Sequence, residues 1–137
     1  MKYIFIVCVA ILLFSFMVVN GETVLAPENE IVDRTLDGEI DRLSIKYNVA
    51  SSTARAIIYC ESRMYGSAVN VNYSNGVAWS IDSGPFQIND YYHKDTMTRL
   101  GLDYYNQWDS LEYGFILLKD QGLSPWKASK GCWSSRI

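Results

Sequence analysis

The stretch VNVNYSNGVAWSI, residues 69–81, decides the fold. Apolar and polar residues alternate on both sides of Asn75-Gly76, as they do in strands that bury one face. Asn-Gly is the dipeptide that two-residue hairpin turns prefer, because both positions tolerate a positive φ. The sequence therefore predicts one antiparallel β-hairpin within the polar segment of residues 65–83.

Two helical patterns precede this hairpin. The first begins at Glu39 and ends at Asn48, where the apolar spacing breaks. The second is capped by Ser51 or Ser52, and its last turn carries residues 60–62. The apolar positions that define both helices are Ile40, Leu43, Tyr47, Ala54, Ile57 and Ile58.

Helical character resumes after Pro85. Asp109, followed three residues later by Glu112, resembles a capping box that opens a helix ending at Gly122. A final turn carries residues 126–133. The predicted fold class is α+β and mostly helical, with a small β-hairpin lobe packed beside a helical lobe and a ligand cleft between them.

The run of residues 3–19 carries no charged side chain and predicts export. It is either the core of a signal peptide, residues 1–21, that is cleaved off, or an uncleaved N-terminal membrane anchor. Residues 22–38 then form a linker and residues 39–137 the folded domain. In both cases the domain leaves the cytoplasm, so we expect a protein that is secreted or held in the cell envelope, in the periplasm or at the cell wall.

The composition excludes several classes of protein. Of the 137 residues, 49% are hydrophobic and 20% are charged, which is typical of a compact domain. The net charge of −3 lacks the positive field that binding to nucleic acid requires. Three cysteines and one histidine are too few for a structural zinc site. We expect no metal, no cofactor and a monomer.

The cysteines bear on the compartment and on stability. Cleavage of the leader removes Cys8 and leaves Cys60 and Cys132. In an exported chain these two either form a disulfide, which stabilises by about 4 kcal/mol through loop closure, or remain buried thiols.

Glu61 and Asp82 are the candidates for acid chemistry. Glu61 lies in the last turn of a predicted helix, where the macrodipole and apolar neighbours favour its protonated form; the alternative is a solvated side chain at a helix end. Asp82 ends the hairpin and either faces Glu61 across the cleft or caps nearby backbone amides. One protonated and one ionised carboxyl are what glycoside cleavage requires.

Two motifs, Glu61-Ser62 and the later segment of residues 84–87, resemble the lysozyme superfamily, in particular the soluble lytic transglycosylases with their SLT domain and the animal-type lysozymes. The resemblance covers roughly residues 39–133 and implies a lysozyme-like fold. It makes Glu61 the general acid, Asp82 the second carboxylate, and residues 84–87 the base of the sugar cleft. The predicted substrate-binding residues are Ser62, Gly84, Phe86, Gln87, Asn89, Tyr113 and Trp126.

The resemblance implies peptidoglycan as the substrate and as the partner of this chain. The enzyme is then a muramidase that cuts the β-1,4 bond between N-acetylmuramic acid and N-acetylglucosamine, with Glu61 protonating the leaving oxygen. Water completes a lysozyme-like hydrolysis, whereas in a transglycosylase the muramyl 6-hydroxyl closes to a 1,6-anhydro product. The Trp-and-Cys ending of residues 124–133 resembles that of lysozymes and favours hydrolysis, but the product chemistry stays open.

Two other function classes stay open: a catalytically silent carbohydrate-binding module, and a structural protein associated with a virion or an envelope. A pure binder needs neither acid. Gln87 binds Glu61 or substrate, or else satisfies buried backbone groups. His93 has no companions for a metal site and is interpreted as a surface histidine. Candidates for stacking on sugar rings, more than half of them expected in the core, are Tyr65, Tyr73, Trp79, Tyr91, Tyr92, Trp108, Tyr113 and Trp126.

Overall fold

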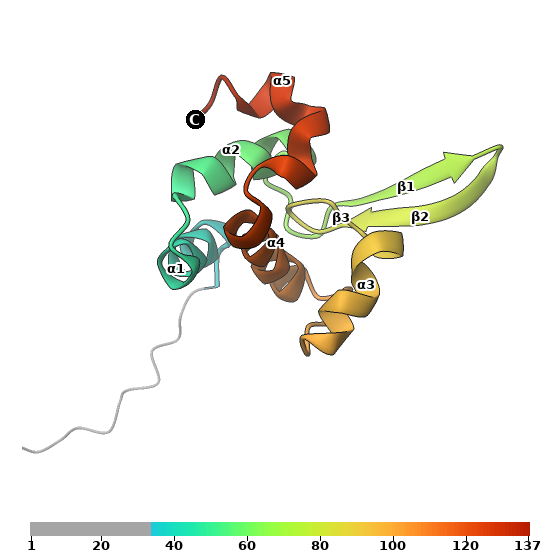
Figure 1. Cartoon of the computed structure of the whole chain (residues 1–137), viewed down its shortest axis with the longest axis horizontal. Coiled ribbons are helices and arrows are strands. Elements are labelled where there is room, and N and C mark those ends of the chain that lie inside the picture. The colour runs from blue at the N-terminus through green and yellow to red at the C-terminus, as the bar shows by residue number, and fades with distance from the viewer. Residues whose placement is uncertain (1–33) are drawn as a thin grey trace, which may run out of the picture. The chain divides into compact units, whose positions relative to one another are not determined.

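The structure, a computed structural model, describes residues 34–137. The predicted signal peptide or anchor and most of the predicted linker lie outside these residues. The described chain forms, in order, α1 (Leu36–Tyr47), α2 (Ser51–Ser62), β1 (Val69–Ser74), β2 (Val77–Ser83), β3 (Ile88–Asn89), α3 (Asp90–Arg99), α4 (Gln107–Gln121), the 3-10 helix η1 (Ser124–Ser129) and α5 (Lys130–Trp133). The α+β class is therefore confirmed (Figure 1).

Both predicted N-terminal helices are present, with different starts. Thr35 caps α1, its hydroxyl accepting a 3.1 Å hydrogen bond from the amide of Gly38. The helix thus begins three residues before the predicted Glu39, and the end of the predicted linker is helical. In α2 neither Ser51 nor Ser52 is the cap, because Ala50 takes that position without a side-chain hydrogen bond.

The hairpin forms as its alternation predicts. Asn75 and Gly76 make the turn with φ values of 51° and 78°, the positive values that this dipeptide supplies. The sequence did not reveal β3, because two residues are too short to show alternation. β3 pairs antiparallel with β2 and sets Asp82 opposite Asn89. Strands β1 and β2 extend away from the helices (Figure 1).

Helix α4 is longer than predicted at its start. Asn106 caps it, and the side-chain oxygen accepts hydrogen bonds from the amides of Trp108 and Asp109. The predicted capping box at Asp109 is therefore wrong, since Glu112 lies inside the helix and binds Lys46 instead. Gly122 ends the helix as predicted.

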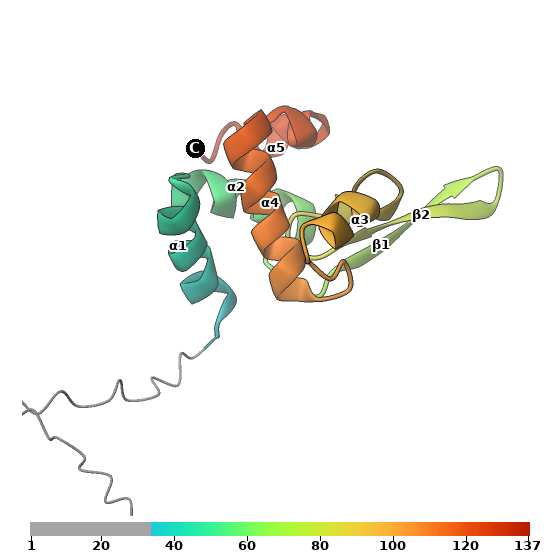
Figure 2. The same ribbon diagram turned by 60° about the horizontal axis from the view of Figure 1, so that its bottom comes forward.

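The apolar core lies where α1, α2 and α4 meet, and it extends to the loop before β3. Gly114 allows a close approach there, because a Cβ at this position would come within 2.0 Å of the ring of Phe86. Figure 2 shows α4 between the first two helices and α3. No helix within residues 34–137 has the length and apolar character that crossing a bilayer demands. Prominent fully buried side chains are Ile40, Leu43, Ile57, Ile58, Phe86, Leu111 and Phe115.

Candidate active site

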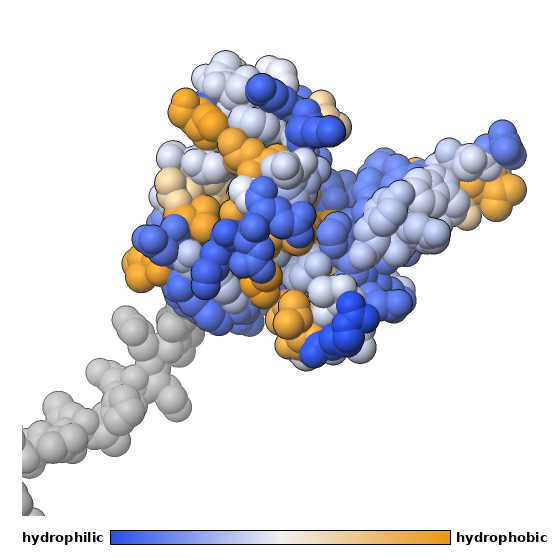
Figure 3. All heavy atoms as spheres, viewed as in Figure 1, coloured by the Kyte–Doolittle hydropathy of each residue, from blue (hydrophilic) through white to orange (hydrophobic). Residues whose placement is uncertain are grey.

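A cavity of about 380 Å³ opens between the helices and the base of the sheet. Its wall combines Glu61 from α2, Asn89 from β3, His93 from α3 and Trp126 from η1. Figure 3 shows the surface hollowed between the helical body and the base of the largely polar hairpin. Helices and sheet therefore both contribute to one site, as the predicted cleft requires.

Glu61 is half-buried in the wall of this cavity, in the last turn of α2. Its Oε1 accepts a 2.5 Å hydrogen bond from the hydroxyl of Ser129. Burial raises the pKa of Glu61 above its ordinary value, the charge of Asp82 raises it further, and the hydrogen bond from Ser129 acts in the opposite direction. The net effect favours a carboxyl that keeps its proton to higher pH than a free glutamate.

Asp82 is held by two amide side chains. Its Oδ1 accepts from the side-chain amide of Asn89 at 2.7 Å, and its Oδ2 accepts from that of Asn72 at 2.9 Å. Both amides also donate to the hydroxyl oxygen of Ser80. The pairing register produces this network, because Asn72 lies opposite Ser80 and Asp82 opposite Asn89 on one face of the sheet. Two N–H donors match the two acceptor oxygens of an ionised carboxylate.

The two acids therefore have different surroundings. Glu61 lines the cavity, and Asp82 does not. Glu61 is partly shielded from water, and Asp82 is surrounded by polar donors. Such a pair can supply a proton from one side chain and a fixed negative charge from the other. The predicted backbone-capping role of Asp82 is not observed among the described contacts, which run to side-chain amides.

Gln87 satisfies backbone groups, the second of its two predicted roles. Its amide donates to the carbonyls of Ala68 at 3.2 Å and Gly84 at 2.9 Å. No hydrogen bond to Glu61 is present within residues 34–137. Gly84 has a φ of 77°, and a Cβ there would lie 2.3 Å from the hydroxyl of Ser110. Gly84 therefore permits a close approach to Ser110, and Gln87 lines the cavity wall.

Four of the seven predicted substrate-binding residues do not line the cavity: Ser62, Gly84, Phe86 and Tyr113. Phe86 is completely buried, and its carbonyl accepts a 3.0 Å hydrogen bond from the indole of Trp126. The hydroxyl of Ser62 donates to a carbonyl one turn earlier in α2. Tyr113 is buried with its hydroxyl 3.1 Å from Nδ1 of His93. These side chains support the wall, whereas Trp126 reaches it.

The interpretation of His93 as a surface residue is wrong. It is half-buried, lines the cavity and contacts Tyr113. Burial lowers the pKa of His93, so its ring is neutral at neutral pH. No helical spacing marked His93, because Asn89 belongs to β3 and His93 to α3, so the rule that residues four apart share a helix face does not link them. Ser129, which binds Glu61, was also missed, and no local motif marks it.

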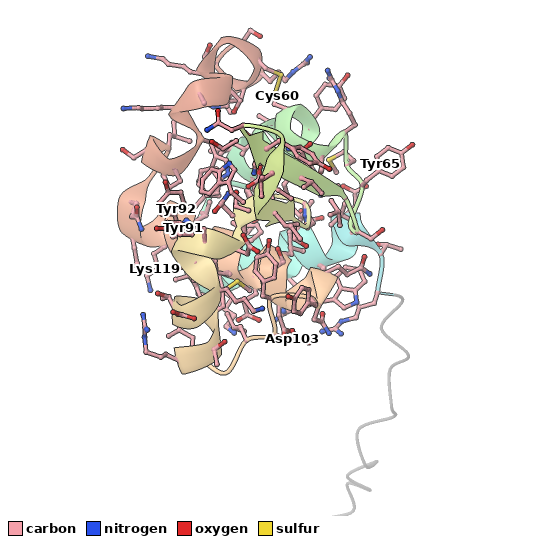
Figure 4. The ribbon with its side chains drawn as sticks, turned by 90° about the vertical axis from the view of Figure 1, so that its right-hand side faces the viewer. Cys60, Tyr65, Tyr91, Tyr92, Asp103 and Lys119 are labelled. Carbon is pink, nitrogen blue, oxygen red and sulfur yellow. A yellow bond between two sulfur atoms is a disulfide. The ribbon has the colours of Figure 1, made fainter. Side chains whose placement is uncertain are left out.

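An exposed aromatic cluster lies next to the cavity. The rings of Trp79, Tyr91 and Tyr92 contact one another edge to face, with centroids 5.1–6.4 Å apart. Tyr92 also lines the cavity wall. Figure 4 shows Tyr91 and Tyr92 on the α3 side of the sheet and Tyr65 on the other side. Among the candidates for stacking, Tyr92 is thus well placed to meet a ligand.

Of the two alternatives for the cysteines, a disulfide or buried thiols, the structure has the disulfide. Cys60 of α2 is bonded to Cys132 of α5, with the two Cα atoms 5.9 Å apart. The bond joins the residue before Glu61 to the element that follows Ser129. Within the described range, no three His, Cys, Asp or Glu side chains gather in a way that could hold a metal ion.

Comparison of the chain with family models, with curated proteins and with solved structures found no match. Any function proposed for the chain therefore depends on the chemistry of this site.

Proposed function

We propose that this protein is a peptidoglycan-cleaving muramidase with a lysozyme-like fold, acting outside the cytoplasm. Its reaction is cleavage of the β-1,4 bond between N-acetylmuramic acid and N-acetylglucosamine. The observation that carries the proposal is the position of Glu61, which is half-buried in the wall of an open cavity. Its pKa is raised by this burial and by the negative charge of Asp82. The residue motifs that resemble lysozymes and lytic transglycosylases supply the substrate class.

The reaction begins with protonation of the leaving oxygen by Glu61 while positive charge develops at the muramyl C1. Asp82 supplies a compensating negative charge, which Asn72 and Asn89 hold in place. Glu61, now ionised, then accepts a proton from the group that attacks C1. Water as the attacking group gives a hydrolysed product, and the muramyl 6-hydroxyl gives a 1,6-anhydro product.

The decisive experiment is digestion of purified sacculi by the exported domain and by its Glu61→Gln variant. Glutamine keeps the shape of the side chain and removes the proton, so we expect release of soluble muropeptides to fall by about 10²–10⁴-fold. Binding to sacculi, measured by co-sedimentation, should be retained. Asp95→Asn is the control, because Asp95 is an exposed carboxylate on α3.

The same digests separate the remaining alternatives. Mass spectrometry distinguishes the two enzymatic products, which differ by one water molecule. Sacculi that bind the wild-type domain without releasing muropeptides would favour the silent binding module. Lysis at an unchanged rate by Glu61→Gln would remove Glu61 from the acid role and contradict the proposal.

A further inference from the structure

We infer that Ser129 is a positioning residue that holds Glu61 in both of its protonation states during the reaction. This inference rests on the proposed function, because it assigns the partner of the proposed general acid. Two distances carry it. The Ser129 hydroxyl oxygen lies 2.5 Å from Oε1 of Glu61 and 3.1 Å from the carbonyl oxygen of Trp126.

A hydroxyl has one hydrogen and two acceptor lone pairs, so these two contacts cannot both be donated at once. The proton that reaches substrate must be on the free oxygen, Oε2, so Oε1 accepts the Ser129 hydrogen while Glu61 is protonated. When Glu61 is ionised, Oε1 accepts the same hydrogen, and the hydrogen bond becomes charge-assisted. The Glu61–Ser129 hydrogen bond thus keeps its direction and becomes stronger when the proton leaves.

The reaction passes through both protonation states. In the first step the Oε2–H bond of Glu61 breaks, its proton moves to the glycosidic oxygen, and the bond from that oxygen to C1 breaks. Oε1 of the carboxylate that remains still accepts the Ser129 hydrogen. In the second step the attacking hydroxyl, from water or from the muramyl 6-position, bonds to C1 and returns its proton to Oε2 of Glu61.

The surrounding structure fixes the hydroxyl at this place. The carbonyl of Trp126 also accepts a 2.8 Å hydrogen bond from the indole of Trp133, so it is held at a defined point. The disulfide between Cys60 and Cys132 ties the chain just before Glu61 to the chain just after Ser129. Oε1 carries the hydrogen bond that Glu61 makes within the described chain, so Oε2 is left for substrate.

The charged and titratable groups around Glu61 define what a pH experiment can detect. Tyr92 and His93, both from α3, line the same cavity, and Asp82 of β2 acts on Glu61 through its charge. The hydrogen bond from Ser129 lowers the pKa of Glu61, against the effect of burial. Removing the hydroxyl should therefore raise that pKa, whereas a purely structural role for Ser129 would leave it unchanged.

The test compares Ser129→Ala with Ser129→Thr, which keeps the hydroxyl. For Ser129→Ala we expect kcat on sacculi to fall by about tenfold with KM little changed, because the carboxylate loses a charge-assisted hydrogen bond. The basic limb of the pH profile of kcat/KM should move to higher pH. Ser129→Thr should restore most of the rate and the wild-type profile. Thermal melting of both variants shows whether each is folded.

Titration of the Glu61 side-chain carboxyl by carbon NMR supplies a readout that needs no activity. A higher pKa in Ser129→Ala than in the wild type supports the inference. An unchanged pKa and rate in a folded Ser129→Ala variant overturn it, as does an equal loss of rate in Ser129→Thr. An inactive wild-type protein whose Glu61 still responds to Ser129→Ala would instead refute the proposed function and leave the contact standing.

Discussion

Glu61 is easier to bury with its proton than without it. A carboxylate in a partly dehydrated wall loses more solvation than a carboxylic acid, and the charge of Asp82 adds repulsion. The hydrogen bond from Ser129 recovers only part of this cost. The ionised form of Glu61 therefore lowers the stability of the folded protein at neutral pH. Such a cost is typical of a side chain that has a functional role.

Replacing Glu61 should therefore stabilise the protein at neutral pH. The raised pKa means that, as pH rises, the unfolded chain loses this proton before the folded one, so stability falls until the pH passes the folded pKa. Glu61→Gln removes that loss. We expect a higher melting temperature than the wild type at neutral pH and no difference below the ordinary pKa of glutamate, measured by circular dichroism. A variant that melts below the wild type at neutral pH would contradict this account.

Gly84 and Gly114 should not tolerate a side chain. Alanine at Gly84 would combine a positive φ with a Cβ 2.3 Å from the hydroxyl of Ser110, and alanine at Gly114 would meet the Phe86 ring. We expect each substitution to lower the free energy of unfolding by about 2–4 kcal/mol, measured by urea denaturation. Gly131→Ala is the control, because no atom lies within 4 Å of its added Cβ. Equal stability of all three variants would contradict the packing described.

Secondary-structure elements with a strong local pattern were the ones that the sequence predicted. The apolar spacing of α1 and α2 and the Asn-Gly turn of the hairpin are such patterns, whereas β3 is too short to have one. Glu61 and Asp82 could be proposed as site residues because each belongs to a recognisable motif. The partners that define their states were not, since Ser129 and Asn72 reach them only through the packing of η1 and the register of the sheet.

The disulfide connects α2, which carries Glu61, to α5, which directly follows η1. It joins α2 to α5 across 72 positions of sequence, so its loss should destabilise the protein by about 4 kcal/mol. In a Cys60→Ala, Cys132→Ala double variant we expect a lower urea midpoint and a loss of lysis, because α5 directly follows η1, which carries Ser129 and Trp126. Reductant should reproduce both effects in the wild type and change nothing in the variant. Unchanged lysis with full stability would show that packing alone holds α5 against α2.

At the scale of the whole molecule, the proposed chemistry and the proposed recognition of sugars depend on different parts. The helices supply Glu61 and the residue that holds it, and the sheet supplies Asp82 with its amide donors. The aromatic cluster at the edge of the cavity adds apolar ring faces, which suit the C–H faces of sugars. None of these contacts depends on long-range attraction, and the net charge of −3 provides none toward an anionic wall.

This charge balance predicts an unusual dependence of wall lysis on salt. Attraction between a basic enzyme and an anionic wall weakens as salt screens it, but an acidic chain is weakly repelled and gains from screening. We therefore expect the rate of sacculus digestion to stay level or to rise between low and moderate ionic strength. The matched test is Asp95→Lys together with Asp103→Lys, two exposed acids that contribute nothing to the cavity wall. The two changes bring the net charge of the chain from −3 to about +1, so this double variant should digest faster at low salt and lose the rise of the rate with salt. A steep loss of wild-type activity with salt would mean that a local basic surface governs the encounter with the wall.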